Sequence, residues 1–132
     1  MEKTVRLNII APGREKLTEE VLSLTTTEVD GKVEFLANYA PIIVATIPTV
    51  SSFTTLNGDK KKLFTSSGIV YIKDNIINFC CDSFNFAEEI DKNRAEQALK
   101  RAEKRINSKD GNIDIERAKK AFARAKARLE LK

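Results

Sequence analysis

The sequence has no histidine and no tryptophan, and it contains no glycine-rich phosphate loop of the Walker type. Without histidine there is no Ser-His or Cys-His nucleophile pair and no histidine metal site. The phosphate loop would have supplied backbone donors to a bound nucleotide. These absences leave little for ordinary hydrolytic catalysis.

Cysteine is also scarce, and the two residues present, Cys80 and Cys81, are adjacent. Neighbouring side chains on a strand point to opposite faces, and a disulfide between adjacent cysteines is strained. We therefore expect two reduced thiols in a sheet.

Long apolar runs are missing as well. The longest, PIIVATIP from Pro41 to Pro48, is far shorter than the ~20 residues of a membrane-spanning helix. The N-terminal MEKTVRLNII has no cleavable signal pattern, so we expect a cytoplasmic protein. The length of 132 residues fits one domain, or a small domain with an appendage, at ~100–200 residues per domain.

The charge is divided unevenly along the chain. Residues 1–87 carry 9 Lys/Arg and 10 Asp/Glu, a net charge of −1, whereas residues 88–132 carry 14 and 9, a net charge of +5. A near-neutral part is thus joined to a basic part, which indicates that the two parts have different roles.

The first part of the chain has the pattern of β-strands. Val5, Leu7 and Ile9 alternate with polar residues, and prolines bracket a further strand, IIVATI. Dipeptides typical of hairpin turns punctuate the remaining segments: Asp30-Gly31, Asn57-Gly58 and Asp74-Asn75. Short strands at such spacing predict an all-β sandwich or barrel.

We expect this β domain to occupy residues 1–87 and to bury a modest core of apolar residues from its strands. The expected core is Val5, Leu7, Ile9, Leu22, Leu24, Val33, Leu36, Ile43, Ile47, Ile69, Tyr71, Ile77 and Phe79.

The second part, residues 88–132, has the periodicity of two helices separated by NSKDGN. Apolar residues recur at spacings of three and four, first as Ala95, Ala98, Ala102 and Ile106, then as Ala118, Ala121, Phe122, Ala125 and Leu129. The pattern predicts an antiparallel two-helix hairpin. Alanine buries little area at ~25 cal/mol per Å², so the hairpin should be only conditionally stable.

A short repeat, I-D-x-x-R-A, begins both predicted helices, at Ile90–Ala95 and at Ile113–Ala118. A helix start explains the aspartate as N-cap and the isoleucine before it as a staple. It does not explain the arginine, because a cation near a helix N-terminus is mildly unfavourable. Either the guanidinium groups have a ligand, or these segments are only a pair of helix starts.

The order of β-sandwich and alanine-rich hairpin, with three motifs, resembles the epsilon subunit of F-type ATP synthases nearly end to end. The first motif is DGKVEFLANYAP, from Asp30 to Pro41; the second is SGIVYI followed by NIINF, within Ser67 to Phe79; the third is the Ile90–Ala95 segment. The chain departs from the family pattern at Glu34, Tyr39 and Ile69, where the family usually has glycine, histidine and glycine. The strand alternation is kept.

The resemblance implies a bacterial rotor subunit without catalytic activity, bound peripherally at the cytoplasmic face of the cell membrane. It implies that the sandwich contacts the gamma subunit and the c-ring, with Lys32, Asn38 and Tyr39 in a ring-facing loop. It also implies that the hairpin extends toward the alpha and beta subunits and inhibits ATP hydrolysis. No cofactor is required.

A regulatory ATP site in the hairpin is a further implication of the resemblance. The matching residues are Ile90, Asp91, Arg94, Ala95, Arg101, Arg124 and Arg128. Planar guanidinium groups suit a polyphosphate, and Asp91 could accept a hydrogen bond from an adenine amino group. Asn85 stands where ATP-binding relatives tend to carry a carboxylate. The alternative is a solvated basic face with ion pairs such as Glu96 with Lys100.

A basic hairpin that binds nucleic acid is the alternative from another functional class. However, the first predicted helix mixes acidic residues among its cations, and the only aromatic residue of the hairpin, Phe122, lies on the predicted seam. Aromatic residues that could stack on bases are therefore missing, and we expect no nucleic-acid partner.

Overall fold

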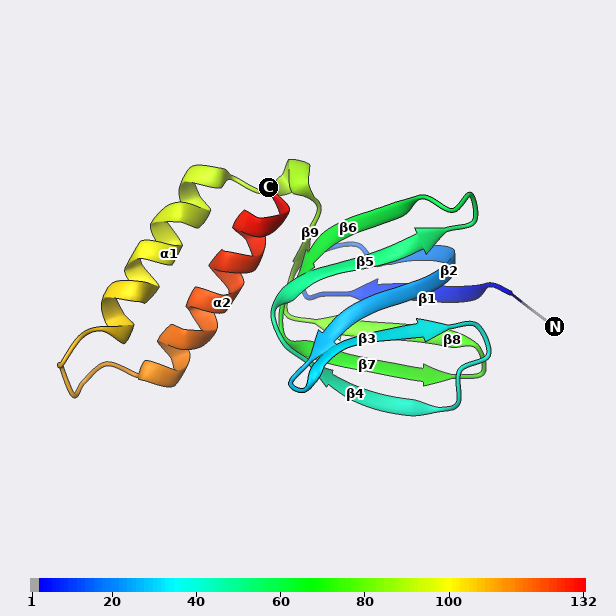
Figure 1. Cartoon of the computed structure of the whole chain (residues 1–132), viewed down its shortest axis with the longest axis horizontal. Coiled ribbons are helices and arrows are strands. Elements are labelled where there is room, and N and C mark those ends of the chain that lie inside the picture. The colour runs from blue at the N-terminus through cyan, green and yellow to red at the C-terminus, as the bar shows by residue number, and fades with distance from the viewer. Residues whose placement is uncertain (1–2) are drawn as a thin grey trace.

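The computed structural model describes residues 3–132 as a β-sandwich followed by a helical hairpin (Figure 1). In this range the strands are β1 (Val5–Ile10), β2 (Leu17–Glu28), β3 (Gly31–Leu36), β4 (Ile42–Thr46), β5 (Thr49–Thr55), β6 (Lys60–Thr65), β7 (Gly68–Lys73), β8 (Ile76–Cys81) and β9 (Phe84–Asn85). A 3₁₀ turn, Ala87–Glu89, leads into α1 (Lys92–Ile106) and α2 (Ile115–Leu131). The predicted fold class is confirmed, and the predicted boundary after residue 87 lies within the 3₁₀ turn.

β2 is the corner of the sandwich. Its first half pairs with β1, and its second half pairs with β3 and β5. The register against β5 shifts between Val21 and Ser23, where an extra residue bends the strand. One strand therefore belongs to both layers, which are β4-β7-β8-β1-β2 and β3-β2-β5-β6-β9.

β1 lies between β2 and β8 in the first layer. Its pairing with β8 is parallel, with Leu7 opposite Ile77 and Ile9 opposite Phe79. Every other strand pairing in residues 3–132 is antiparallel. The first and eighth strands of the chain therefore lie side by side within this layer.

All three predicted turn dipeptides lie at hairpins, but only Asp74-Asn75 forms the two-residue loop itself. Glu28 pairs with Gly31, so the loop between β2 and β3 is Val29-Asp30, and the loop that contains Asn57-Gly58 has four residues. The three predicted hairpin turns join β2 to β3, β5 to β6 and β7 to β8. Asp74 and Asn75 have φ values of 53° and 58°, the left-handed conformation that a two-residue type I′ turn requires.

The two cysteines are free thiols, as predicted, and occupy opposite faces of β8. Cys80 is exposed and Cys81 is buried. Burial raises the pKa of the Cys81 thiol to about 12, so this thiol is protonated and unreactive at neutral pH.

The predicted core is right in part. Leu22 and Val33 are half-buried, and six of the predicted residues are buried: Val5, Leu7, Ile9, Leu24, Ile77 and Phe79. Four phenylalanines that were not in the prediction are also fully buried: Phe35, Phe53, Phe64 and Phe84.

The prediction is wrong for five exposed residues, namely Leu36, Ile43, Ile47, Ile69 and Tyr71. In β7, Val70 and Ile72 face the core instead. The physical reason is that GIVYIK is apolar on both faces, so alternation cannot distinguish the inner face from the outer one. The error therefore identifies a strand whose outer face is unusually apolar.

Neither α1 nor α2, the helices of the described residues, is long and apolar enough to cross a membrane.

Candidate functional site

Both copies of the I-D-x-x-R-A repeat are helix N-caps. The Asp91 Oδ1 atom accepts a hydrogen bond from the backbone N–H of Arg94 at 3.2 Å, and Asp114 Oδ1 accepts one from Arg117 at 3.1 Å. The caps satisfy donors that α1 and α2 would otherwise leave unpaired. They account for the aspartates, and the arginine side chains need a separate explanation.

The hairpin attaches to the sandwich through α2, which lies between α1 and the strands in Figure 1. α2 contacts β5 and β6, and a small buried cluster fills the junction. The cluster consists of Phe64, Ile90, Ala95 and Ala127, with Leu129 and Leu131 packed against it. A single phenylalanine is the largest side chain of this cluster, so the docked state rests on a small apolar contact.

Arg128 is the main polar contact across this junction. Its guanidinium group lies 4.3 Å from the centre of the Phe64 ring. It also donates to the side-chain oxygens of Asn85 and Ser83, at 3.4 and 3.3 Å. One residue of α2 therefore binds β6 and the segment that leaves the sandwich.

A hollow of about 320 Å³ lies between the first turns of α1, the end of α2 and β9. It is lined by Asn85, Ile90, Asp91, Arg94, Ala95, Ala98, Arg101 and Arg128. Six of the seven residues predicted for the nucleotide site are thus brought together, and Arg124 is not among the lining residues. Asn85 and Ala98 are additions to the predicted set, and we refer to this site as the arginine hollow.

The lining of the arginine hollow is mainly positively charged. Three of its lining residues are arginines, and Asp91 is its only carboxylate. Burial lowers the pKa of Arg128 below its usual range, and the nearby charges of Arg124 and Arg94 lower it further. Arginine stays charged under these conditions, so mutual repulsion persists until an anion neutralises it. The chemistry suits a polyphosphate or a set of carboxylates.

Arg14 contacts the segment that joins the sandwich to the hairpin, at Phe84 and at Glu89. It donates to the Phe84 carbonyl at 2.6 Å, lies 4.0 Å from the centre of the Phe84 ring, and pairs with Glu89 at 3.3 Å. Arg14 belongs to the loop between β1 and β2, 70 residues earlier than Phe84. No local pattern in the sequence indicates such a contact.

The residues predicted for a ring-facing loop lie at two different places. Lys32 is the second residue of β3, whereas Asn38 and Tyr39 follow the end of that strand. Tyr39 packs edge-on against Phe35 with ring centres 5.2 Å apart, and the Asn38 N–H donates to Asn75 at 2.8 Å. The segment of Asn38 and Tyr39 therefore lies beside the β7–β8 turn, whereas Lys32 lies at the hairpin end of the sandwich, where it lines a hollow with Glu130 and Leu131 of α2.

No group of three or more His, Cys, Asp or Glu side chains within residues 3–132 is arranged to hold a metal ion.

Two family models match consecutive parts of the chain. Residues 4–87 match the family described as ATP synthase, Delta/Epsilon chain, beta-sandwich domain. Residues 88–132 match ATP synthase, Delta/Epsilon chain, long alpha-helix domain.

Similar proteins span the whole chain. The ATP synthase epsilon chain of Clostridium novyi (strain NT) is 41% identical over 131 residues, which covers 99% of each chain. That of Clostridium kluyveri (strain ATCC 8527) is 40% identical and covers 99% of this chain and 98% of its own.

Solved structures share the fold at lower identity. A chain in the Euglena gracilis mitochondrial ATP synthase, in a structure of OSCP, F1 and the c-ring, superposes with a TM-score of 0.83 at 18% identity. The match covers 96% of this chain and 80% of that one. A chain in the central stalk and c-ring structure from Tetrahymena thermophila gives 0.57 at 11% identity, covering 98% and 93%.

Proposed function

The chain belongs to the delta/epsilon family of ATP synthase chains, as an epsilon subunit of an F-type enzyme, and from this we propose that it is a non-catalytic part of the rotor. In this role the sandwich binds the gamma subunit and the c-ring and helps couple ion-driven rotation to ATP synthesis. The hairpin restrains ATP hydrolysis when it extends toward the alpha and beta subunits. The observation that carries the proposal is the pairing of an exposed apolar strip with a weakly docked basic hairpin.

The apolar strip consists of Ile10, Ile43, Ile69, Tyr71 and Cys80 on the outer face of the first layer. Strand pairing makes it continuous, because Ile43 lies opposite Tyr71, and Cys80 lies opposite both Ile69 and Ile10. Ile43 is 68% exposed and Ile69 is 51% exposed. Contiguous apolar surface of this kind is typical of a protein interface, and we assign it to the gamma subunit.

The hairpin has the properties of a detachable part. Its inner seam buries Ala95, Ala102, Ala118 and Ala125, which contribute little area each. Its attachment to the sandwich rests mainly on the Phe64 cluster and Arg128. The docked and extended states can therefore lie within a few kcal/mol of each other, as a switch requires.

Removal of residues 88–132 tests the inhibitory role. We expect the truncated chain to assemble and to raise ATP hydrolysis by the assembled enzyme about fivefold or more, a typical size for a regulatory coupling. Steady-state ATPase assays on the purified complex measure this. Ile69→Asp is the matched control, because it disrupts the apolar strip and should prevent assembly while leaving the hairpin intact. Unchanged hydrolysis in an assembled truncated complex would reject the inhibitory role.

Binding of ATP in the arginine hollow is the second function that we propose. Arg94, Arg101 and Arg128 line the same hollow, and these three cations, with the free space of about 320 Å³, support the proposal. Asn85 supplies a neutral side chain at the rim, and its side-chain oxygen already accepts a hydrogen bond from Arg128. We therefore expect a regulatory ligand that binds reversibly, with phosphates toward the arginines.

Thermal unfolding with and without ATP checks this site. At ATP tenfold above Kd, binding to the folded state adds about 1.4 kcal/mol to the free energy of unfolding. Arg94→Ala should abolish the increase, whereas Arg105→Ala, on an exposed part of α1 outside the hollow, should keep it. Absence of any ATP effect on the parent chain would rule the site out.

We further propose a peripheral position at the cytoplasmic face of the bacterial membrane, reached through the complex. The alternative of a nucleic-acid-binding hairpin is not favoured, because both family models assign the chain to ATP synthases.

A further inference from the structure

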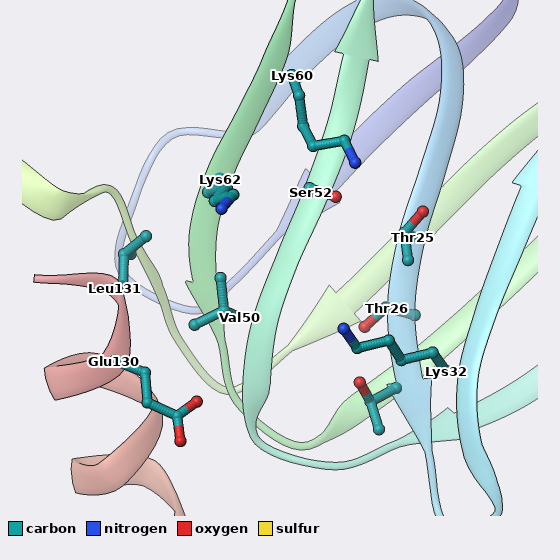
Figure 2. Close-up of a pocket in the computed structure, with 10 residues that line it drawn as sticks. Thr25, Thr26, Lys32, Val50, Ser52, Lys60, Lys62, Glu130 and Leu131 are labelled. Atoms are coloured by element: carbon teal, nitrogen blue, oxygen red, sulfur yellow. The ribbon is translucent and has the colours of Figure 1, made fainter.

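A second hollow, about 440 Å³ in volume, lies on the outer face of the second layer beside the end of α2 (Figure 2). Strand pairing builds its floor, with Thr25 of β2 opposite Ser52 of β5 and Ser52 opposite Lys62 of β6. Lys60 precedes Lys62 by two residues and so shares its face, and Lys32 reaches the hollow from β3.

This hollow is rich in unused hydrogen-bond donors. No ion pair in residues 3–132 involves Lys32, Lys60 or Lys62. The hydroxyl groups of Thr25 and Ser52 are half-buried, and no hydrogen bond joins them to other described residues. Three unpaired cations around two free hydroxyls repel one another, and a multivalent anion would relieve that repulsion.

We propose that this lysine hollow is a second anion site, which takes a phosphate-bearing ligand through Lys32, Lys60 and Lys62. Lysine binds phosphate as a point charge, and the two hydroxyls donate from the floor. The site is separate from the arginine hollow, with which it shares no lining residue. Its concave shape suits a compact anion such as inorganic pyrophosphate.

The end of α2 opposes this ligand. Glu130 is exposed on the rim of the hollow and belongs to the last turn of α2, and this end of a helix carries partial negative charge. The Glu130 carboxylate and the C-terminal end of α2 both repel an anion, and both move away from the hollow when the hairpin undocks. By linkage, an anion in the lysine hollow favours the undocked hairpin.

Amide chemical shifts of the full-length chain during titration with pyrophosphate test the proposal residue by residue. We expect saturable shifts at Thr25, Ser52 and Lys62. Lys62→Gln should weaken binding roughly fivefold and Glu130→Gln should strengthen it roughly threefold, the usual size for single charges near a surface site. Lys61→Gln is the matched control, because Lys61 is the neighbouring exposed lysine outside the hollow, and it should change affinity less than twofold.

Two results would overturn the proposal. One is shifts confined to residues around Arg94 and Arg101; the other is equal weakening by Lys61→Gln and Lys62→Gln. Sedimentation with phosphatidylglycerol vesicles distinguishes the sources of phosphate. Vesicle binding that requires Lys62 identifies a lipid headgroup, whereas pyrophosphate shifts without vesicle binding identify a free anion. Binding to neither rejects the site.

Discussion

Gly68→Ala is expected to destabilise the sandwich by about 3 kcal/mol or more, the upper end of the range for overpacked cores. A Cβ atom at this position would clash with the Cys80 carbonyl oxygen and lie 2.7 Å from the Cys81 Cα atom. These are backbone atoms of the neighbouring strand β8, so the clash cannot be relieved by turning a side chain. Thermal unfolding should show a melting temperature lower by roughly 10 °C for a chain of this size.

Gly111→Ala is the matched control for this prediction. A Cβ atom at Gly111 would meet no heavy atom within 4 Å, and the residue lies in the exposed loop between α1 and α2. Its melting temperature should stay within about 2 °C of the parent value. Similar melting temperatures for both variants would contradict the close packing of β7 against β8.

Arg128→Ala should release the hairpin from the sandwich. The substitution removes the contact with the Phe64 ring and two hydrogen bonds to Asn85 and Ser83. Losing these charge-assisted contacts costs about 2 kcal/mol, which is roughly thirtyfold in the ratio of docked to undocked hairpin. Amide hydrogen exchange should therefore become faster in α2, while exchange in β1 and β8 stays unchanged.

Arg124→Ala is the matched control, because it also removes a positive charge from α2 but no polar contact with the described part of the sandwich. Arg124 lies one turn before Arg128 on the same helix, and no hydrogen bond or ion pair joins it to the described part of the sandwich. Amide hydrogen exchange in α2 of the Arg124→Ala variant should remain close to that of the parent chain. The proposed inhibitory role of the extended hairpin further predicts that Arg128→Ala lowers ATP hydrolysis by the assembled enzyme, the opposite of the effect expected for truncation. Equal exchange in both variants would contradict the role of Arg128.

The hairpin is well predicted from the sequence because its signals are local. Alanine spacing identifies the buried faces at Ala95, Ala102, Ala118 and Ala125, and the aspartates identify both helix starts. The resemblance to a family adds the arginines of the hollow. Helical periodicity and capping act within a few residues, so they can be read without knowledge of the tertiary structure.

Long-range contacts and the choice of strand face are not predictable in this way. Arg14 meets Phe84 across 70 residues and Arg128 meets Ser83 across 45, and neither pair has a local pattern. In β7 the inner and outer residues are both apolar, so hydrophobicity alone cannot exclude Ile69 and Tyr71 from the core. A partner that covers the outer face removes the usual penalty for apolar exposure.

The parallel pairing of β1 with β8 has a consequence for the order in which the chain folds during synthesis. Leu7 is translated early, yet its neighbour Ile77 follows only after β2 through β7. One edge of β1 therefore stays open until most of the sandwich has left the ribosome, and closure is slowed by the length of the intervening chain. α1 and α2 follow β8 in the chain, so both pairing partners, β1 and β8, are synthesised before the hairpin that docks on the sandwich.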